Sequence, residues 1–437
     1  MFEPTVTEKT IHGASLAYGK PDPIPQSPRA IVKGTVGGHP SAFALTDAML
    51  SRHFLAVGGT GTGKTNLMYH IVSQLRDSML GTDSMVVFDS KGDFLERFQR
   101  PGDIVVGRSC GNGATGTAYA KWGLSMEVLA DGAASVPANA FEISSSLFSE
   151  RIRRNSSNPF FPNAAKDLFA ALLICLMRAG LSPSNRDFSE ALSSMTADEM
   201  RALLDDHPDL ASIGSYIAKG SAAQANGVIA EMHSVAREVL SGPFSSPVAD
   251  FSMRSFIRSP AGKACFIEYD LSTGEVLAPV YSLLIDLALK EALGRSGGKG
   301  RLWVIADEMR LLPNLTHLED AINFGRSAGV SVIAGLQTID QLESSYADAA
   351  KARNAVAGFS SVAAFSSHDP ATRKAIRDRF GESMVMISHQ QKDGKFASEV
   401  TRGHVVEDWD LIALDVGEAV IGLPEARPFK MKIDLYR

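Results

Sequence analysis

Short runs of apolar residues recur along the chain, and most of them end at a polar or glycine-rich turn. Continuous apolar runs are typical of strands that are buried on both faces of a sheet. Helical periodicity follows several of the runs. This alternation predicts an α/β fold with a mostly parallel sheet and helices on both of its faces. The expected strands are two short ones around a Gly-Gly turn at 30–45, then 54–57, 85–88, 104–106, 263–269, 302–306 and 330–335, with 361–365 and 419–423 as the last two.

The middle of the chain differs from both ends, because strand-like runs disappear between about residues 121 and 250. We therefore predict an all-α domain at 121–250, which interrupts a sheet domain formed by residues 1–120 and 251–437. The helical patterns within the predicted all-α domain cover residues 138–149, 164–177, 197–204 and 222–240.

Two further segments have an unusual composition. Residues 1–29 are polar and proline-rich, and they predict an extended arm. The segment 151–161 (RIRRNSSNPFF) is basic and partly aromatic. We interpret it as a solvated turn, with contact to nucleic acid as the alternative.

A glycine-rich loop lies between the apolar run 54–57 and the helical segment 66–77, and it fits the pattern G-x-x-x-x-G-K-[ST]. Glycines let the backbone curl so that its N–H groups face a polyphosphate, and the following helix adds the positive end of its dipole. The lysine then reaches the β and γ phosphates, and the hydroxyl holds Mg²⁺. We predict that the chain binds ATP with Mg²⁺ through Gly58, Gly59, Thr60, Gly61, Thr62, Gly63, Lys64, Thr65 and Asn66.

Hydrolysis needs acidic groups in addition to the phosphate-binding loop. The run RLWVIADE ends an apolar strand with two acids, Asp307 and Glu308. Asp307 would hold Mg²⁺, and Glu308 would polarise the attacking water. The alternative is a solvated junction between a strand and a loop. Together with the phosphate-binding loop, the two acids predict a P-loop ATPase.

The composition limits the remaining possibilities. The chain has 437 residues, a net charge of −6 and three widely spaced cysteines. A nucleic-acid surface would therefore have to be a local patch, and the cysteines suit a reducing compartment. The beginning of the chain does not resemble a signal peptide, and the longest apolar runs are shorter than a membrane span. We expect a soluble, cytoplasmic chain.

Several spaced motifs resemble the conjugative coupling proteins of type IV secretion, the TraG/TraD family. The run ADEMRLLPNLTHLEDAINFGRSAGVSVIAGLQTIDQLESSY contains the acids, a helix ending in G-R-x-x-G, a strand, and then Gln337. HFLAVGGTGTGKT and VVFDSKGDF are also similar to the family, which usually has a proline where Ser90 stands. The expected helical insertion matches the family's all-α domain. The resemblance extends from about residue 30 to 424.

The resemblance implies a RecA-like DNA-translocating ATPase of the HerA/FtsK superfamily, active as a homo-hexamer with the nucleotide between subunits. Such motors move DNA, usually single-stranded and bound to a relaxase, toward the other type IV secretion components. Arg326 resembles an arginine finger that reaches the γ-phosphate of a neighbour, and Gln337 resembles a γ-phosphate sensor. The resemblance implies four catalytic residues: Lys64, Glu308, Arg326 and Gln337. For two of them another interpretation stays open: Arg326 could be an ordinary surface arginine, and Gln337 a buried, hydrogen-bonded amide.

One feature departs from the family, because its members usually begin with transmembrane helices and this chain shows none. We expect a cytoplasmic protein, or one held at the inner membrane only through partners. Two alternatives to the conjugative motor remain. One is a HerA/FtsK-like DNA pump in repair or phage defence, and the other is a nucleotide-gated recruitment platform with little hydrolysis.

Overall fold

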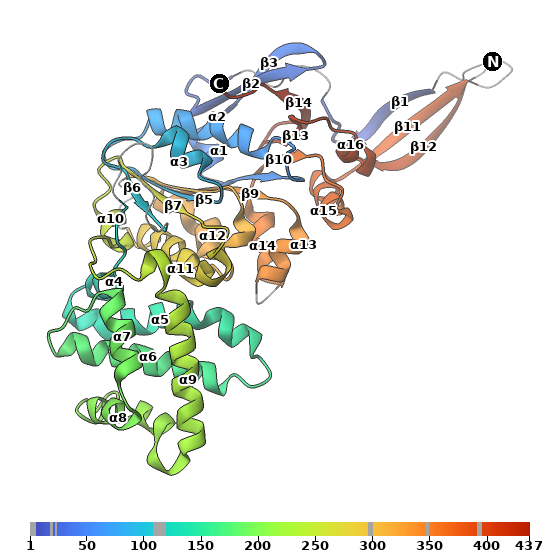
Figure 1. Cartoon of the computed structure of the whole chain (residues 1–437). Coiled ribbons are helices and arrows are strands. Elements are labelled where there is room, and N and C mark those ends of the chain that lie inside the picture. Colours follow the sequence, from blue (N-terminus) through green and yellow to red (C-terminus); the bar gives the residue numbers. More distant parts are fainter. Residues whose placement is uncertain are drawn as a thin grey trace.

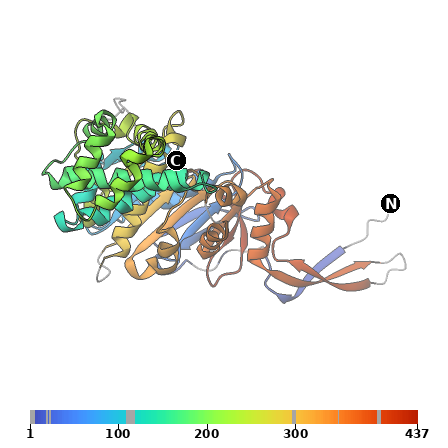
Figure 2. The same cartoon turned by 90° about the horizontal axis from the view of Figure 1, so that it is seen from below.

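The computed structural model describes residues 6–17, 21, 24–107, 119–295, 300–346, 349–390 and 396–437. Figure 1 shows three parts: a large sheet with helices above and below it, a helical lobe below the sheet, and a narrow arm of strands that extends to one side. Seen from below, the lobe and the arm lie at opposite ends of the molecule (Figure 2).

The large sheet has eleven strands in the order β3-β2-β14-β13-β10-β4-β9-β8-β5-β7-β6. Neighbouring strands are parallel from β10 to β6 and antiparallel from β3 to β10. The mostly parallel sheet predicted from the sequence is therefore confirmed. Its strands are β3 (His39–Leu45), β2 (Ala30–Val36), β14 (Phe429–Ile433), β13 (Glu418–Gly422), β10 (Ser361–Phe365), β4 (Phe54–Val57), β9 (Val330–Leu336), β8 (Leu302–Ala306), β5 (Ser84–Asp89), β7 (Ala264–Glu268) and β6 (Ile104–Val106).

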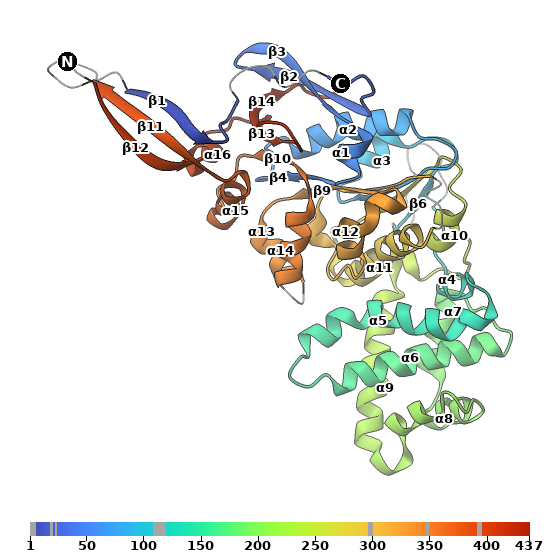
Figure 3. The same cartoon turned by 180° about the vertical axis from the view of Figure 1, so that it is seen from behind.

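Helices cover both faces of this sheet, and each face has its own apolar core. The central strands β4, β5, β8 and β9 are buried along their whole length, which explains their continuous apolar sequences. On one face lie α1 (Asp47–Leu50), α2 (Lys64–Asp77) and α3 (Asp93–Phe98). On the other lie α10 (Met253–Arg258), α11 (Gly274–Leu293), α12 (Leu318–Ala328), α13 (Ile339–Ser345) and α14 (Ala349–Gly358), and α15 (Pro370–Phe380) follows β10 (Figure 3).

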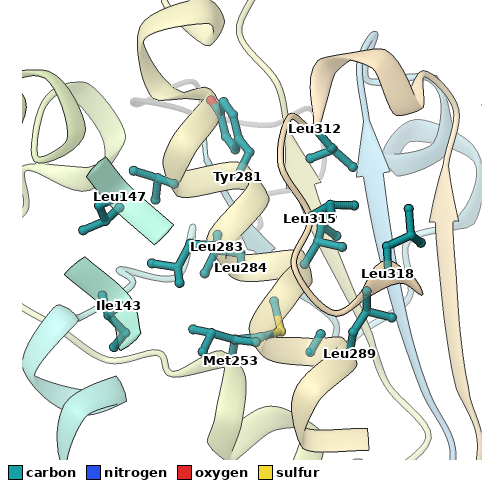
Figure 4. Packing of buried hydrophobic residues seen from close by; sticks show 14 of the residues in the cluster. Ile143, Leu147, Met253, Tyr281, Leu283, Leu284, Leu289, Leu312, Leu315 and Leu318 are labelled. Atoms are coloured by element: carbon teal, nitrogen blue, oxygen red, sulfur yellow. The ribbon is translucent and has the colours of Figure 1, made fainter. Parts of the chain in front are cut away.

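The inserted all-α domain is confirmed as a lobe below the sheet. Helix α11 is buried almost throughout because it lies between the sheet and the lobe. Figure 4 shows its side chains between Ile143 and Leu147 of α5 and the loop that carries Leu312 and Leu315. The lobe consists of α4 (Leu124–Leu129), α5 (Val136–Arg154), α6 (Phe160–Arg178), α7 (Asn185–Ser194), α8 (Ala197–Asp205) and α9 (Ala222–Val239).

The arm is a second sheet that the sequence did not predict. Its three strands are antiparallel in the order β1-β11-β12, and they are β1 (Val6–Gly13), β11 (Glu382–Gln390) and β12 (Phe396–His404). The sequence predicts an extended arm at residues 1–29, and β1 does lie in the arm, but its pairing with β11 was not predicted. The expectation that 361–365 and 419–423 are the last strands is wrong, since β11, β12 and β14 were missed. The short helix α16 (Asp408–Ile412) follows the arm.

Candidate nucleotide-binding site

The predicted functional groups follow four neighbouring strands of the parallel sheet. Strand β4 is followed by the glycine-rich loop, β9 by Gln337, β8 by Asp307 and Glu308, and β5 by Ser90 and Lys91. In the sheet these strands are adjacent in the order β4-β9-β8-β5. Because parallel strands share one carboxyl edge, all of these groups lie along that edge, which is where open α/β sheets bind ligands.

The groups share one cavity of about 200 Å³. The size suits a chain of phosphates better than a whole nucleotide, since small-molecule pockets typically measure about 300–1,000 Å³. A larger cavity, of about 960 Å³, lies beside α13, α14 and α15 and contains none of the predicted site residues. The residues that line the smaller cavity are Thr60, Gly61, Gly63, Lys64, Thr65, Asn66, Ser90, Lys91, Asp307, Glu308 and Gln337.

The glycine-rich loop has the backbone that its sequence predicts. Gly58 and Gly63 have φ angles of 150° and 116°, which side-chain-bearing residues rarely adopt. A Cβ atom on Gly58 would lie 2.7 Å from the Cβ of Phe365 in β10, so the loop could not pack so closely against the sheet with another residue there. Helix α2 begins at Lys64, directly after the loop. Its N-terminal N–H groups and dipole therefore face the cavity, as phosphate binding requires.

Lys64 is buried and turned back onto the loop itself. Its Nζ donates to the carbonyl oxygens of Gly58 and Gly59, at 2.6 and 2.8 Å. Burial lowers the pKa of its ammonium group, and the acidic neighbour Glu308 raises it again. The carbonyls hold the charge in the absence of phosphate, and a polyphosphate in the loop would offer stronger acceptors.

Asp307 lies at the end of β8 and receives its hydrogen bonds from Ser90. The backbone N–H of Ser90 donates to Oδ1 at 3.1 Å, and its hydroxyl donates to Oδ2 at 2.7 Å. Burial raises the pKa of Asp307 to about 7, although both hydrogen bonds act in the opposite direction. The carboxylate and the nearby hydroxyl of Thr65 are oxygen donors of the kind that Mg²⁺ prefers, so the residues present fit this ion.

Glu308 is also buried, but it is not fully hydrogen-bonded. Its side chain bonds to Gln337, whereas Oε1 has no hydrogen-bond partner among the described residues. Burial raises the pKa of Glu308, and the charges of Arg310 and Lys64 counteract this effect. A buried acceptor without a donor costs free energy, so it indicates a site that receives a donor from a ligand or from water.

For the loop after β5, the sequence predicts only that Asp89 and Lys91 lie near the site, and it gives neither residue a role. Asp89 shapes the loop by accepting the backbone N–H groups of Lys91, Gly92 and Leu95, at 3.3, 2.9 and 2.8 Å. Asp89 therefore fixes the loop and does not line the cavity. The contact between Ser90 and Asp307 was missed, because the two residues are 217 positions apart and only the polar turn after an apolar run pointed to this segment.

Arg326 is not part of this cavity. It lies in the last turn of α12, and β9 begins four residues later. A Cβ atom on its neighbour Gly325 would lie 3.1 Å from Val330, at the start of β9, and 3.6 Å from His53, just before β4. Arg326 is therefore near the amino edge of the sheet, about 20 Å from the loop given the length of β9. Its side chain is exposed and makes no ion pair within the part of the chain that the structure describes.

The basic segment of the lobe has its positive charge neutralised. Arg151 pairs with Glu238, and Arg153 and Arg154 both pair with Glu150, at 2.5 and 2.8 Å. A phosphate backbone would have to compete with these carboxylates. The contacts argue against nucleic-acid contact for this segment. The prediction of a turn is correct only for residues 155–159, because 151–154 end α5 and 160–161 begin α6.

The comparisons with known proteins agree with this geometry. Residues 41–406 match the family described as "Type IV secretion-system coupling protein DNA-binding domain". This chain belongs to that family. The resemblance seen in the motifs is thereby confirmed.

Two coupling proteins are similar to this chain over much of its length. The chain is 23% identical over 307 residues to the coupling protein TraD of Escherichia coli (strain K12), covering 69% of this chain and 40% of TraD. It therefore spans less than half of that relative's length. The bacterial conjugative coupling protein TrwBdeltaN70 superposes with a TM-score of 0.75, 26% identity and coverage of 93% and 89% of the two chains. TrwB was also solved with ADP and Mg²⁺, at 25% identity, a TM-score of 0.74 and coverage of 93% and 90%.

Within the described residues one helix, α6, is long and apolar enough to cross a membrane. Most of its apolar side chains are buried against other helices of the lobe, such as α5 and α9. We assign α6 to the core of the lobe.

Proposed function

We propose that this chain is a Mg²⁺-dependent ATPase that drives DNA toward a type IV secretion channel. The observation that carries the catalytic part is the unpaired Oε1 of buried Glu308 in the same cavity as the glycine-rich loop. Family membership supports the coupling of hydrolysis to DNA transport. The structure of TrwB with ADP and Mg²⁺ supports an adenine nucleotide as the ligand.

Each residue of the cavity would have its own role in hydrolysis. Lys64 would leave the carbonyls of its own loop and bind the β and γ phosphates, which the glycine-rich backbone encloses. Asp307 and Thr65 would hold Mg²⁺, which supplies positive charge to the phosphate oxygens. Oε1 of Glu308 would accept a hydrogen bond from the attacking water, and Gln337 would keep that carboxylate in place.

Arg326 would act on the site of a neighbouring subunit. Its position at the opposite edge of the sheet prevents contact with its own cavity, while its exposure leaves it free to reach another chain. A guanidinium suits the charge that develops during phosphoryl transfer. We therefore propose a homo-hexameric ring as the active form, with single-stranded DNA, a relaxase and other secretion components as partners, and membrane contact only through those partners.

Two other functions remain as alternatives. A HerA/FtsK-like pump would use the same site in repair or defence, but the all-α lobe and the family match favour conjugation. A recruitment platform would need no catalytic acid, and the buried Glu308 argues against it.

The deciding experiment measures ATP hydrolysis with and without single-stranded DNA. We expect hydrolysis that DNA stimulates and that Lys64→Ala abolishes, because the phosphates lose their cation. Nucleotide binding without hydrolysis, at any DNA concentration, would support the recruitment platform and overturn the motor.

A further inference from the structure

Lys91 occupies a distinctive place in the row of strand ends. It follows β5, whereas the glycine-rich loop follows β4, and β9 and β8 lie between these strands. The two ends of the row are roughly 14 Å apart, given the usual spacing of strands. Asp307 and Glu308 lie between them, at the end of β8. Lys91 therefore faces the cavity from the side opposite the glycine-rich loop.

The backbone at Lys91 is held firmly, although its side chain is exposed. The N–H groups of Lys91 and Gly92 both donate to Oδ1 of Asp89, and Gly92 has a φ of 82° that closes the turn. Asp89 itself is completely buried. The turn thus fixes the point from which the lysine side chain starts.

The Lys91 side chain has no counter-ion within the described part of the chain, yet it lines the same cavity as Lys64. Burial lowers the pKa of Lys64, and the nearby positive charge of Lys91 lowers it further. Two ammonium groups that share a small cavity repel each other until an anion lies between them. Asp307 and Glu308 line the same cavity and offset part of this charge, so what Lys91 adds is a second cation at the end of the row away from the glycine-rich loop.

We propose that Lys91 is a second phosphate-binding cation, which contacts the terminal phosphate of a nucleoside triphosphate and does not reach a diphosphate. This inference rests on the proposed function. The glycine-rich loop encloses the inner phosphates next to β4. The terminal phosphate must extend toward Glu308 on β8, where the attacking water would be, and the next strand end along the row carries Lys91.

This placement makes Lys91 a sensor of the nucleotide state. With a triphosphate, the ammonium group would bind the terminal phosphate and link the β5 loop to the glycine-rich loop. After loss of that phosphate, the contact would be released. Since lysine acts as a point charge on a flexible stem, arginine at this position would retain most of the contact.

The test compares the affinities of the folded protein for ADP and for a non-hydrolysable ATP analogue, both with Mg²⁺. We expect Lys91→Ala to weaken binding of the analogue roughly tenfold or more, the scale of one charge-assisted hydrogen bond, and that of ADP less than about twofold. Lys91→Arg should keep the ratio of the two affinities. The matched control is Lys263→Ala, which removes an exposed lysine just before β7, at the opposite edge of the sheet.

The outcomes separate this inference from the proposed function. Equal changes in both affinities, or no change in either, would overturn the role of Lys91 and leave nucleotide binding intact. A loss of DNA affinity alone would also overturn it, because Lys91 would then contact DNA. If the unaltered protein bound neither nucleotide, the proposed function and this inference would fail together.

Discussion

Buried carboxylates at the two edges of the parallel sheet have different surroundings. At the amino edge, Asp83 accepts the N–H groups of Leu80 and Arg301, both at 2.9 Å. Asp103 accepts the N–H of Ala264 at 2.8 Å and pairs with Arg76 at 2.5 Å. Each of these acids has a donor on both oxygens.

At the carboxyl edge, Asp307 also has a donor on each oxygen, but Glu308 is less well satisfied. Glu308 has an oxygen without a partner, and Asp307 depends on the single residue Ser90. Burial raises the pKa of both groups. A buried charge that is not fully paired costs stability, and proteins keep such groups where they function. The contrast separates the fully paired acids of the amino edge from Glu308, whose unpaired oxygen can accept a donor from a ligand or from water.

A large effect on turnover is expected at Arg326, the exposed cation at the amino edge. Arg326→Ala should lower turnover by roughly a thousandfold or more under assembling conditions, the scale of a lost arginine finger. Nucleotide affinity of the monomer should stay nearly unchanged, since the residue lies outside its own cavity. Steady-state hydrolysis measures the turnover, and equilibrium binding measures the nucleotide affinity.

Mixed assemblies show whether Arg326 acts between subunits. In a mixture of Arg326→Ala and Lys64→Ala chains, some interfaces combine an intact glycine-rich loop with an intact Arg326. Recovered activity would support action on a neighbour. No recovery, with mixed assembly shown independently, would contradict it.

Glu308→Gln should reduce turnover by roughly a hundredfold to ten thousandfold, because an amide does not accept a proton from water as a carboxylate does. Binding of ATP should persist. The unfolding free energy should not fall, since the change removes a buried charge that lacks a full set of partners. Turnover at the original rate would show that another group activates the water.

Asp103→Asn tests the buried ion pair with Arg76 at the amino edge of the sheet. Arg76 would be left buried without its counter-charge, so the unfolding free energy should fall by about 3–5 kcal/mol. Turnover per folded molecule should be unchanged, because the pair is remote from the cavity. The control is Asp77→Asn, which breaks the exposed pair with Arg100 at the same 2.5 Å distance and should cost about 1 kcal/mol or less. If chemical denaturation showed equal losses of unfolding free energy for Asp103→Asn and Asp77→Asn, burial of the ion pair would not explain its effect.

The carboxyl edge of the sheet was largely predictable from the sequence, and the reason is local. A buried parallel strand has a continuous apolar run, and its end is marked by the first polar residues, as at Asp307 and Glu308. Strand β14 was missed because the predicted strands rest mostly on continuous apolar runs, whereas it alternates buried Phe429, Met431 and Ile433 with more exposed residues, the pattern of a strand with one buried face. Strand β1 was missed because it pairs with β11 across at least 370 positions, a pairing that no local pattern encodes. Strands β11 and β12 form a local hairpin; β12 was missed because it contains no continuous apolar run, whereas the short apolar run in β11 was overlooked.

The site shows the same limit. The glycine-rich loop and the two acids follow from short motifs, whereas Ser90 and Lys91 acquire their surroundings only when β5 lies beside β8. Arg326 was suggested by resemblance. Its place at the amino edge follows from the course of α12, and its catalytic role stays a prediction.

The smallest expected effect concerns His53, which is buried at the amino edge beside the start of β9. Its Nδ1 accepts the N–H of Val332 at 3.0 Å, and burial lowers its pKa to about 4. The imidazole is therefore neutral in the folded state at neutral pH, while the unfolded chain binds a proton below about pH 6.5. The stability that His53 contributes should be complete above pH 6.5 and should fall by up to about 3 kcal/mol as the pH approaches 4.

His53→Asn provides the comparison, because asparagine tolerates the φ of 64° at this position and can still accept the N–H of Val332. The difference in unfolding free energy between the two proteins should shift in favour of the variant as the pH falls from 7 to 4, since the variant has no imidazole to protonate. Turnover at pH 7 should be the same for both. A difference that is independent of pH would mean that His53 keeps an ordinary pKa, and that the amino edge is less tightly closed than its hydrogen bonds indicate.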